Sequence, residues 1–171
     1  MDAAAVLDLL ASRAATLASA ESLTGGMLAA RITAVPGASR LYVGGVVGYS
    51  TEVKQELLGV PAALVERHGV VSPECARAMA DGARRLLSAT WALSTTGVAG
   101  PDLQEGRPVG TAFVGIAGPD LLTVVALELS GNREQIRERT CDEALAALGR
   151  ILGEFSTGKN PASGSVGPTD G

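Results

Sequence analysis

The chain has 171 residues, 46% of them hydrophobic, which is enough for one domain with its own core. Its net charge of −4 and its aromatic content of only 3% argue against a basic, base-stacking surface, so we expect no nucleic-acid partner. No apolar run approaches the roughly 20 residues of a membrane span, and no secretory leader precedes the first helix. We therefore expect a cytoplasmic protein with no membrane partner.

The first half of the chain alternates helix-like and strand-like segments. Apolar side chains that recur every three or four residues indicate amphipathic helices, whereas β-branched and glycine-rich runs indicate strands. We expect helices over residues 2–14 and 27–34, strands over 16–20 and 41–49, and a short helix capped by Ser50 or Thr51. The second strand is predicted to be buried, because it is apolar and rich in glycine.

The second half adds one helix, three strands and a last helix. Ser72 is a predicted N-cap, followed by proline at the first helical position and an acid in the first turn. Asn132 and Gln135 resemble a capping box that opens the last helix. Strands are predicted over residues 91–95, 109–117 and 121–129, the last two joined as an antiparallel hairpin.

These elements predict one α/β domain over residues 1–155, a three-layer α/β/α structure on a mixed, mostly parallel sheet. Residues 156–171 are polar and glycine-rich, so we expect a disordered tail. Cys75 and Cys141 are predicted to be buried, reduced thiols.

One lysine stands out in the part of the chain predicted to fold. Of the 14 basic residues 12 are arginine, and the only lysines are Lys54 and Lys159, the latter in the predicted tail. Lysine can lose its proton when it is buried, whereas arginine cannot. Lys54 is therefore a candidate for proton chemistry, although chance in an arginine-rich composition explains its isolation equally well.

The strand at 16–20 turns through serine, threonine and two glycines into the next helix. Backbone N–H groups at such a turn can bind an anion, and glycine allows a ligand to approach the backbone closely. Ser22 lies at the start of this turn, where its hydroxyl can act as a nucleophile or bind phosphate. The alternative is that Ser22 or Thr24 is simply the N-cap of the helix.

Three polar clusters follow predicted strands, and ligands of open α/β sheets bind at such carboxyl ends. They are A-E-S-L-T-G-G, G-Y-S-T-E-V-K-Q-E-L-L-G-V and T-G-V-A-G-P. Together with V-P-G-A-S, H-G-V-V-S-P and R-P-V-G-T, in this order, they resemble the CinA C-terminal domain family, the nicotinamide-nucleotide amidohydrolases. The resemblance runs from about residue 7 to residue 155.

The resemblance implies hydrolysis of the carboxamide of nicotinamide mononucleotide (NMN) to nicotinic acid mononucleotide and ammonia, by the stand-alone form of an NMN deamidase. It implies no metal and no other cofactor. By position, Ser22 resembles the nucleophile, Lys54 the general base and Tyr49 a hydroxyl that relays or positions the proton. Arg133 or Arg137 resembles a clamp for phosphate or substrate.

The same comparison makes further residues candidates for substrate binding: Glu21, Thr24, Gly25, Gly26, Thr96, Gly97 and Gly100. The amides of residues 24–26 would bind either the oxyanion or the phosphate. Each candidate also has a structural alternative: Glu21 bonding the turn backbone, Tyr49 buried in a strand, and residues 96–100 forming a turn without substrate contact. Two stretches depart from the family pattern, at residues 102–105 and at Asn132.

A lysine base must be largely neutral, so its pKa must lie well below about 10.4. We expect burial to lower the pKa of Lys54, together with a position in the first turn of a helix, where the dipole disfavours a cation. The single histidine, His68, lies outside the clusters, which disfavours a Ser-His-Asp triad.

Two other functions compete with NMN hydrolysis: a non-catalytic pyridine-nucleotide sensor and a serine-lysine hydrolase of a different amide. A homodimer is the expected assembly.

Overall fold

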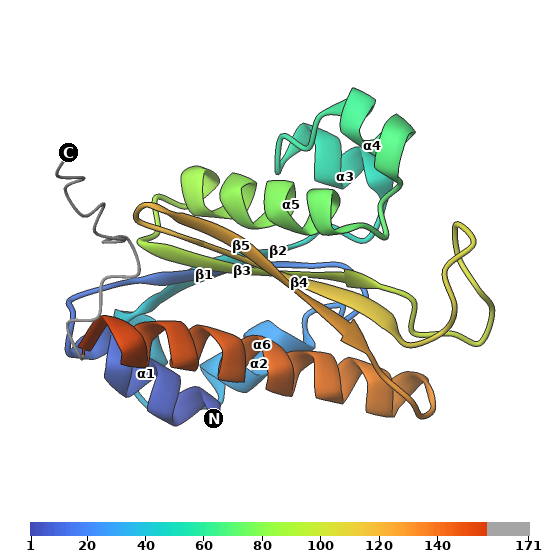
Figure 1. The fold of residues 1–171 in the computed structure, drawn as a ribbon. Helices are drawn as coiled ribbons and strands as arrows, with labels where there is room; N and C mark the ends of the chain where they lie inside the picture. Colours follow the sequence, from blue (N-terminus) through green and yellow to red (C-terminus); the bar gives the residue numbers. More distant parts are fainter. Residues whose placement is uncertain (157–171) are drawn as a thin grey trace, which may run out of the picture.

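The computed structural model describes residues 1–156, which are built on a five-stranded sheet of order β2-β1-β3-β4-β5 (Figure 1). Three strands are parallel, namely β1 (Leu17–Glu21), β2 (Tyr42–Val47) and β3 (Trp91–Gly97). The last two, β4 (Thr111–Gly118) and β5 (Leu121–Glu128), form an antiparallel hairpin beside β3. The sheet is therefore mixed, as predicted.

Helices cover both faces of this sheet (Figure 1). One face is covered by α1 (Ala3–Ala11), α2 (Met27–Thr33) and α6 (Arg133–Ser156), and the other by α5 (Pro73–Leu86). Two short helices, α3 (Thr51–Glu56) and α4 (Ala62–His68), lie beyond α5, and a 3-10 turn, η1 (Ala38–Arg40), precedes β2. The predicted three-layer α/β/α architecture is confirmed.

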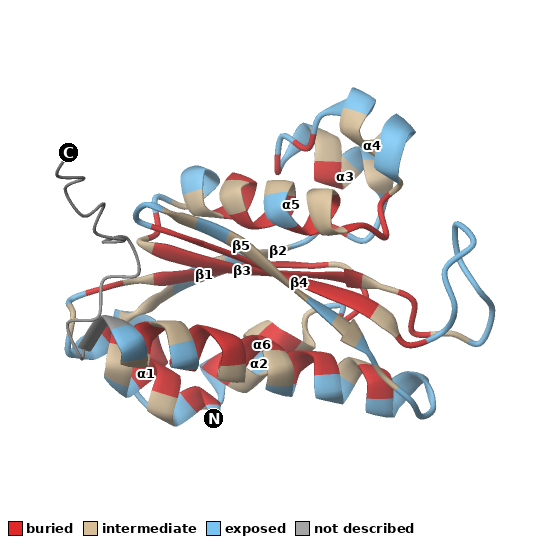
Figure 2. Cartoon of the chain, in the orientation of Figure 1, coloured by how far each residue is buried: buried red, intermediate tan, exposed pale blue. Residues whose placement is uncertain are grey.

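The middle strands form the centre of the core (Figure 2). All five residues of β1 are buried, as are six of the seven in β3, because helices pack on both of their faces. Leucine and isoleucine from α1, α2 and α6 fill one side, and Met79 and small residues of α5 fill the other. Small side chains such as Ala18 and Ala92 let α5 pack closely on the sheet.

Three predicted helix starts are present. The Ser50 hydroxyl accepts the Val53 N–H at 3.3 Å, so Ser50 rather than Thr51 caps α3. The Ser72 hydroxyl accepts the Cys75 N–H at 3.1 Å at the start of α5. Before α6 the side chains of Asn132 and Gln135 each accept the other's backbone N–H at 3.0 Å, which is the reciprocal capping box.

The structure corrects the expectation that the glycine-rich strand is buried. β2 lies at the edge of the sheet, and its residues alternate between half-buried and exposed, with Val43 46% and Val47 50% exposed. An edge strand has a neighbour on one side only, so an apolar composition does not ensure burial. The dimer expected from this strand and the last helix stays a prediction.

The last helix extends further along the chain than expected. Ser156, predicted to begin the tail, is the last residue of α6, and the rest of the predicted tail, 157–171, lies outside the described residues. Within residues 1–156 no helix combines the length and apolar character required to cross a membrane.

Candidate active site

A pocket of about 220 Å³ opens at the carboxyl ends of β1, β2 and β3. Its wall is formed by the turn after β1, the segment from Tyr49 to Lys54, the stretch before α5, the loop after β3 and the first residue of α6. Because the parallel strands end on one edge of the sheet, these distant segments meet there. Seven sequence candidates line this pocket: Ser22, Tyr49, Lys54, Thr96, Gly97, Gly100 and Arg133.

Glu21 holds the turn that carries Ser22. Its carboxylate, only 1% exposed, accepts the N–H groups of Gly26, Leu28 and Ala29 at 2.8–3.0 Å and the Thr24 hydroxyl at 2.7 Å. It therefore satisfies the otherwise unpaired donors at the N-terminus of α2, where negative charge is favourable. We reassign Glu21 from substrate contact to support of the turn, the alternative already raised for it.

Two further residues fix this turn from either side. The Thr24 hydroxyl donates to Glu21 and so must accept from the Thr95 hydroxyl, 2.7 Å away, which ties the turn to β3. The Arg137 guanidinium donates to the carbonyls of Leu23 at 3.1 Å and Thr24 at 2.7 Å. Thr24 and Arg137 do not line the pocket, so their geometry indicates a positioning role.

Some backbone N–H groups of the turn already donate to acceptors close by, whereas the N–H of Leu23 has no acceptor among residues 1–156. Gly25 N–H donates to the Ser22 carbonyl at 3.1 Å, and Gly26 N–H donates to Glu21. Two of the three amides predicted to bind an oxyanion or phosphate are thus already used, and neither glycine lines the pocket. Within residues 1–156 no acceptor bonds the N–H of Leu23, the pocket residue directly after Ser22.

Neither Ser22 nor Thr24 is the N-cap of α2. The N-cap is Gly26, whose φ of +94° suits glycine. Glycine has no side chain, so the N-cap residue itself makes no capping hydrogen bond. The capping role belongs to Glu21 instead. The Ser22 hydroxyl is therefore not committed to the helix, and Ser22 is held by its backbone N–H, which donates to the Thr95 carbonyl at 2.9 Å.

Lys54 lines the same pocket as Ser22 and is 1% exposed. Its Nζ donates to the Tyr49 carbonyl at 3.2 Å, and no carboxylate of the described residues pairs with it within 4.0 Å. Burial lowers the pKa of Lys54, while Cys75, Glu105 and Glu52 oppose the shift. A buried lysine with one neutral acceptor is suited to exist as the free amine.

The helix dipole does not contribute to this shift as expected. α3 has six residues, and Lys54 is the fourth of them, in its last turn rather than its first. A cation is favoured at a helix C-terminus, so the lowered pKa of Lys54 arises from burial. A helix this short was predicted from the sequence, but the position of its end depends on tertiary packing.

Tyr49 and Arg133 lie at the mouth of the pocket. Tyr49 is 60% exposed, and its hydroxyl accepts from the Arg133 guanidinium at 2.9 Å. The same guanidinium donates to the Gly100 carbonyl at 2.6 Å. Tyr49 is therefore not a buried strand tyrosine, and Arg133 joins three segments of the pocket wall while remaining exposed.

Thr96 lies deeper in the pocket than these two residues. It is 1% exposed, and its hydroxyl donates to the Val70 carbonyl at 2.6 Å. The loop that follows contributes Asp102 and Gln104 to the wall, and the stretch before α5 contributes Val70 and Val71. Sequence reasoning did not assign these four or Leu23 to the site, although two clues existed: the H-G-V-V-S-P motif and the unusual loop at 102–105.

The remaining reactive groups lie outside the pocket. Cys75 and Cys141 are buried free thiols, as expected, and burial raises their pKa to about 11 and about 12. His68 lies at the end of α4, with its Nδ1 3.7 Å from Glu74. Among residues 1–156 no cluster of three or more His, Cys, Asp or Glu side chains is arranged to hold a metal ion.

Fold and site together define a three-layer α/β/α protein with a pocket at the carboxyl ends of its parallel strands. The chain belongs to the CinA C-terminal domain family, whose model matches residues 2–152. The resemblance noted in the sequence is thereby confirmed.

Individual relatives agree with this assignment. A CinA-like protein of Frankia casuarinae is 48% identical over 163 residues, covering 95% of this chain and 38% of the relative. A CinA-like protein of Anaeromyxobacter is 49% identical over 146 residues, covering 85% of this chain and 36% of the relative. The chain thus spans well under half the length of these curated relatives.

Solved structures share the fold over nearly their whole length. The competence damage-inducible protein A of Klebsiella pneumoniae superposes with a TM-score of 0.87 at 33% identity, covering 90% of this chain and 96% of that chain. A competence/damage inducible protein of Agrobacterium tumefaciens gives 0.84 at 28% identity, covering 88% and 93%.

Proposed function

We propose that this protein is an amidohydrolase that converts NMN to nicotinic acid mononucleotide and ammonia, with Ser22 as nucleophile and Lys54 as general base. The observation that carries the proposal is that a serine on a rigid turn and a buried lysine with a lowered pKa line one pocket. Membership of the CinA C-terminal domain family supports the substrate, because the family resemblance implies that chemistry.

An amide is a weak electrophile, so its hydrolysis requires an activated nucleophile. In the proposed reaction the neutral Lys54 amine accepts the proton of the Ser22 hydroxyl as its oxygen attacks the carboxamide carbon. The tetrahedral intermediate collapses when Lys54 returns the proton to the nitrogen, which leaves as ammonia. The resulting ester of Ser22 is hydrolysed by water, which Lys54 activates in the same way.

The developing oxyanion requires a hydrogen-bond donor that is already in place. The N–H of Leu23 is suited to this role, because Leu23 lines the pocket directly after Ser22 and this amide has no acceptor among the described residues. The amide after the nucleophile serves the same purpose in other serine hydrolases. The bonds from Arg137 to the Leu23 and Thr24 carbonyls fix the orientation of the turn.

The phosphate of the substrate is assigned to Arg133. The pocket, at about 220 Å³, is smaller than the roughly 300–1,000 Å³ that encloses a drug-sized ligand, so part of a nucleotide would extend to its mouth. There the exposed Arg133 begins α6, where a helix N-terminus also favours an anion. Arg133 is therefore a better candidate for the phosphate clamp than Arg137.

The test is ammonia release from NMN by the wild type, Ser22→Ala and Lys54→Met, each shown to be folded by circular dichroism. We expect release by the wild type and a loss of at least roughly 10³-fold in both variants. Release that survives Ser22→Ala would refute the acyl-enzyme. A folded wild type that binds NMN without turnover would favour a nucleotide sensor. Equal turnover of free nicotinamide would indicate a different amide substrate.

A further inference from the structure

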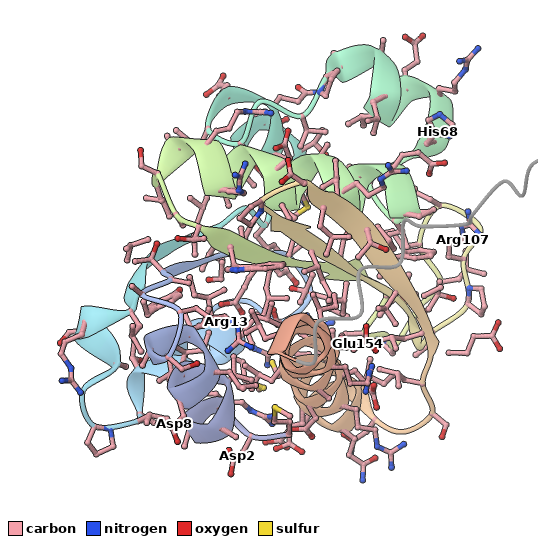
Figure 3. The ribbon with its side chains drawn as sticks, turned by 60° about the vertical axis from the view of Figure 1, so that its left-hand side comes forward. Asp2, Asp8, Arg13, His68, Arg107 and Glu154 are labelled. Atoms are coloured by element: carbon pink, nitrogen blue, oxygen red, sulfur yellow. The ribbon has the colours of Figure 1, made fainter. Side chains whose placement is uncertain are left out.

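The loop between β3 and β4, residues 98–110, forms part of the pocket wall through Asp102 and Gln104. Its outer part is exposed (Figure 2) and lies away from the sheet. Figure 3 shows Arg107 of this loop on the same side of the molecule as His68, at the end of α4. A wall that binds a substrate must be held in place. Backbone bonds of Val98 and Gly110 hold the base of this loop beside β4, and Arg133 bonds Gly100, so the tip depends on a contact of its own.

The tip of the loop has an unusual backbone. Gln104 and Arg107 exchange two backbone hydrogen bonds, of 3.2 and 2.8 Å, around Glu105 and Gly106. Both central residues have positive φ, +52° at Glu105 and +72° at Gly106. Glycine, asparagine or aspartate is usual at the first of these positions in such a two-residue turn. A glutamate is uncommon in the left-handed region, so what its side chain contacts is of interest.

The Glu105 side chain bonds a second segment of the pocket wall. Its Oε1 accepts the Val70 N–H at 3.1 Å, and its Oε2 accepts the Val71 N–H at 2.9 Å. Both valines line the pocket. Both hydrogen bonds run from a backbone N–H to a carboxylate, and such charge-assisted bonds are stronger than bonds between neutral groups.

The receiving segment is shaped for this carboxylate. Gly69 adopts φ +76° and ψ 172°, a conformation essentially restricted to glycine. A Cβ at Gly69 would collide with Oε2 of Glu105, so the absent side chain leaves room for the carboxylate. The Ser72 hydroxyl, which donates to the Gly69 carbonyl at 2.9 Å, closes the turn from its other end.

The connection continues into the floor of the pocket. The Val70 residue that donates its N–H to Glu105 accepts the Thr96 hydroxyl through its carbonyl, at 2.6 Å. Two consecutive hydrogen bonds thereby join the loop to Val70 and Val70 to Thr96, and the Glu105–Val71 bond runs beside the first. Glu105 is not itself among the residues that line the pocket, so its influence on a ligand must pass through its neighbours.

We propose that Glu105 is a positioning residue that fastens the 98–110 loop to Val70 and Val71 and so sets the substrate-binding wall that includes Thr96, Asp102 and Gln104. The inference rests on the proposed function for its substrate, and it explains the H-G-V-V-S-P stretch, to which that function assigns no role. Breaking the two bonds is expected to weaken NMN binding more than it slows the chemical step.

Three variants test the proposal. Glu105→Gly removes the carboxylate and relieves the positive φ, so a loss of function is not a consequence of added strain. Glu105→Gln keeps the shape but places a donor against one of the amides. Leu103→Ala is the matched control, because Leu103 is 68% exposed on the same loop and does not line the pocket.

We measure amide hydrogen exchange at Val70 and Val71, together with the Kd, KM and kcat for NMN. In Glu105→Gly we expect exchange at these two amides at least about tenfold faster, KM and Kd raised roughly tenfold, and kcat changed less than about threefold. Glu105→Gln should show smaller changes in the same direction, and Leu103→Ala none.

Exchange, Kd and KM that stay at wild-type values in Glu105→Gly would overturn the proposal. So would a fall in kcat at constant KM and Kd, because that indicates damage to the chemistry rather than to the wall. If the wild type binds NMN without releasing ammonia, the proposed hydrolysis fails. The role of Glu105 is then still decided by the hydrogen-exchange rates of Val70 and Val71 and by the Kd for NMN. A folded wild type that does not bind NMN overturns both.

Discussion

The Nζ of Lys54 lies 3.2 Å from the backbone carbonyl of Tyr49, and this is the hydrogen bond that the structure gives to its buried amine. A neutral amine and an ammonium can both donate this bond, so it orients Lys54 without requiring its charge. The Tyr49 hydroxyl meanwhile accepts from Arg133 at the mouth of the pocket. Tyr49 therefore bonds both Lys54, the proposed base, through its backbone carbonyl and Arg133, the proposed phosphate clamp, through its hydroxyl.

The activity should depend on pH through Lys54. Burial lowers the pKa of this lysine from 10.5, so the free amine is populated at lower pH than in an unperturbed lysine. We expect kcat/KM for NMN to rise with pH along a titration curve whose midpoint lies below 10.5, and to level off above that midpoint. Lys54→Arg, which stays charged, should be inactive throughout the range. A kcat/KM that falls as pH rises from 6 to about 9 would contradict a lysine base.

The same lysine should reduce the stability of the folded protein. Between its lowered pKa and 10.5 the unfolded chain binds more protons than the folded one, so the free energy of unfolding rises with pH in that window. Lys54→Met should remove this dependence and raise stability at pH 7 by about 1 kcal/mol, or roughly 2–4 °C in Tm. Thermal unfolding measures both effects. Glu56→Met, at an exposed position of α3, is the control, and a Tm lowered by Lys54→Met would contradict the expectation.

Arg133 should determine recognition of the phosphate. Arg133→Met removes the guanidinium that lies at the mouth of the pocket, so we expect KM for NMN to rise at least about tenfold with little change in kcat. Nicotinamide riboside, which lacks the phosphate, should be hydrolysed equally by the wild type and the variant. Arg139→Met is the control, since Arg139 is exposed on α6 and bonds the Ser130 carbonyl outside the pocket. Equal losses for both substrates would assign Arg133 to the chemistry instead.

Glu21 should be important for folding rather than for substrate contact. Glu21→Gln places an amide where a buried carboxylate accepts four hydrogen bonds. We expect a loss of roughly 3 kcal/mol, because at least one buried donor is left opposite a donor, and Tm should fall by about 6–12 °C. Glu138→Gln, on the exposed side of α6, should change stability by less than about 0.5 kcal/mol. An unchanged Tm in Glu21→Gln would show that the carboxylate is dispensable to α2.

Local sequence patterns determined the elements of this protein. Periodicity placed the helices and strands, and the serine caps at Ser50 and Ser72 and the capping box at Asn132 marked three helix starts correctly. Such features depend on bonds between residues a few positions apart, which a sequence displays directly. The spaced motifs also identified the family and brought Ser22, Tyr49, Lys54, Thr96 and Arg133 into one candidate site.

Only the tertiary structure decided which of these residues line the pocket and which support the residues that do. Glu21 and Arg137 are charged residues of the kind that bind substrates, but the structure shows both bonded to the Ser22 turn and the start of α2, and neither lines the pocket. The edge position of β2 and the C-terminal end of α3, which places Lys54 in the last turn of that helix, were likewise hidden, because strand order and helix ends depend on packing against distant segments. The hydrogen bonds between Glu105 and the amides of Val70 and Val71 span 35 and 34 residues of sequence. A contact of this kind forms only when two distant loops meet, so no local sequence pattern predicts it.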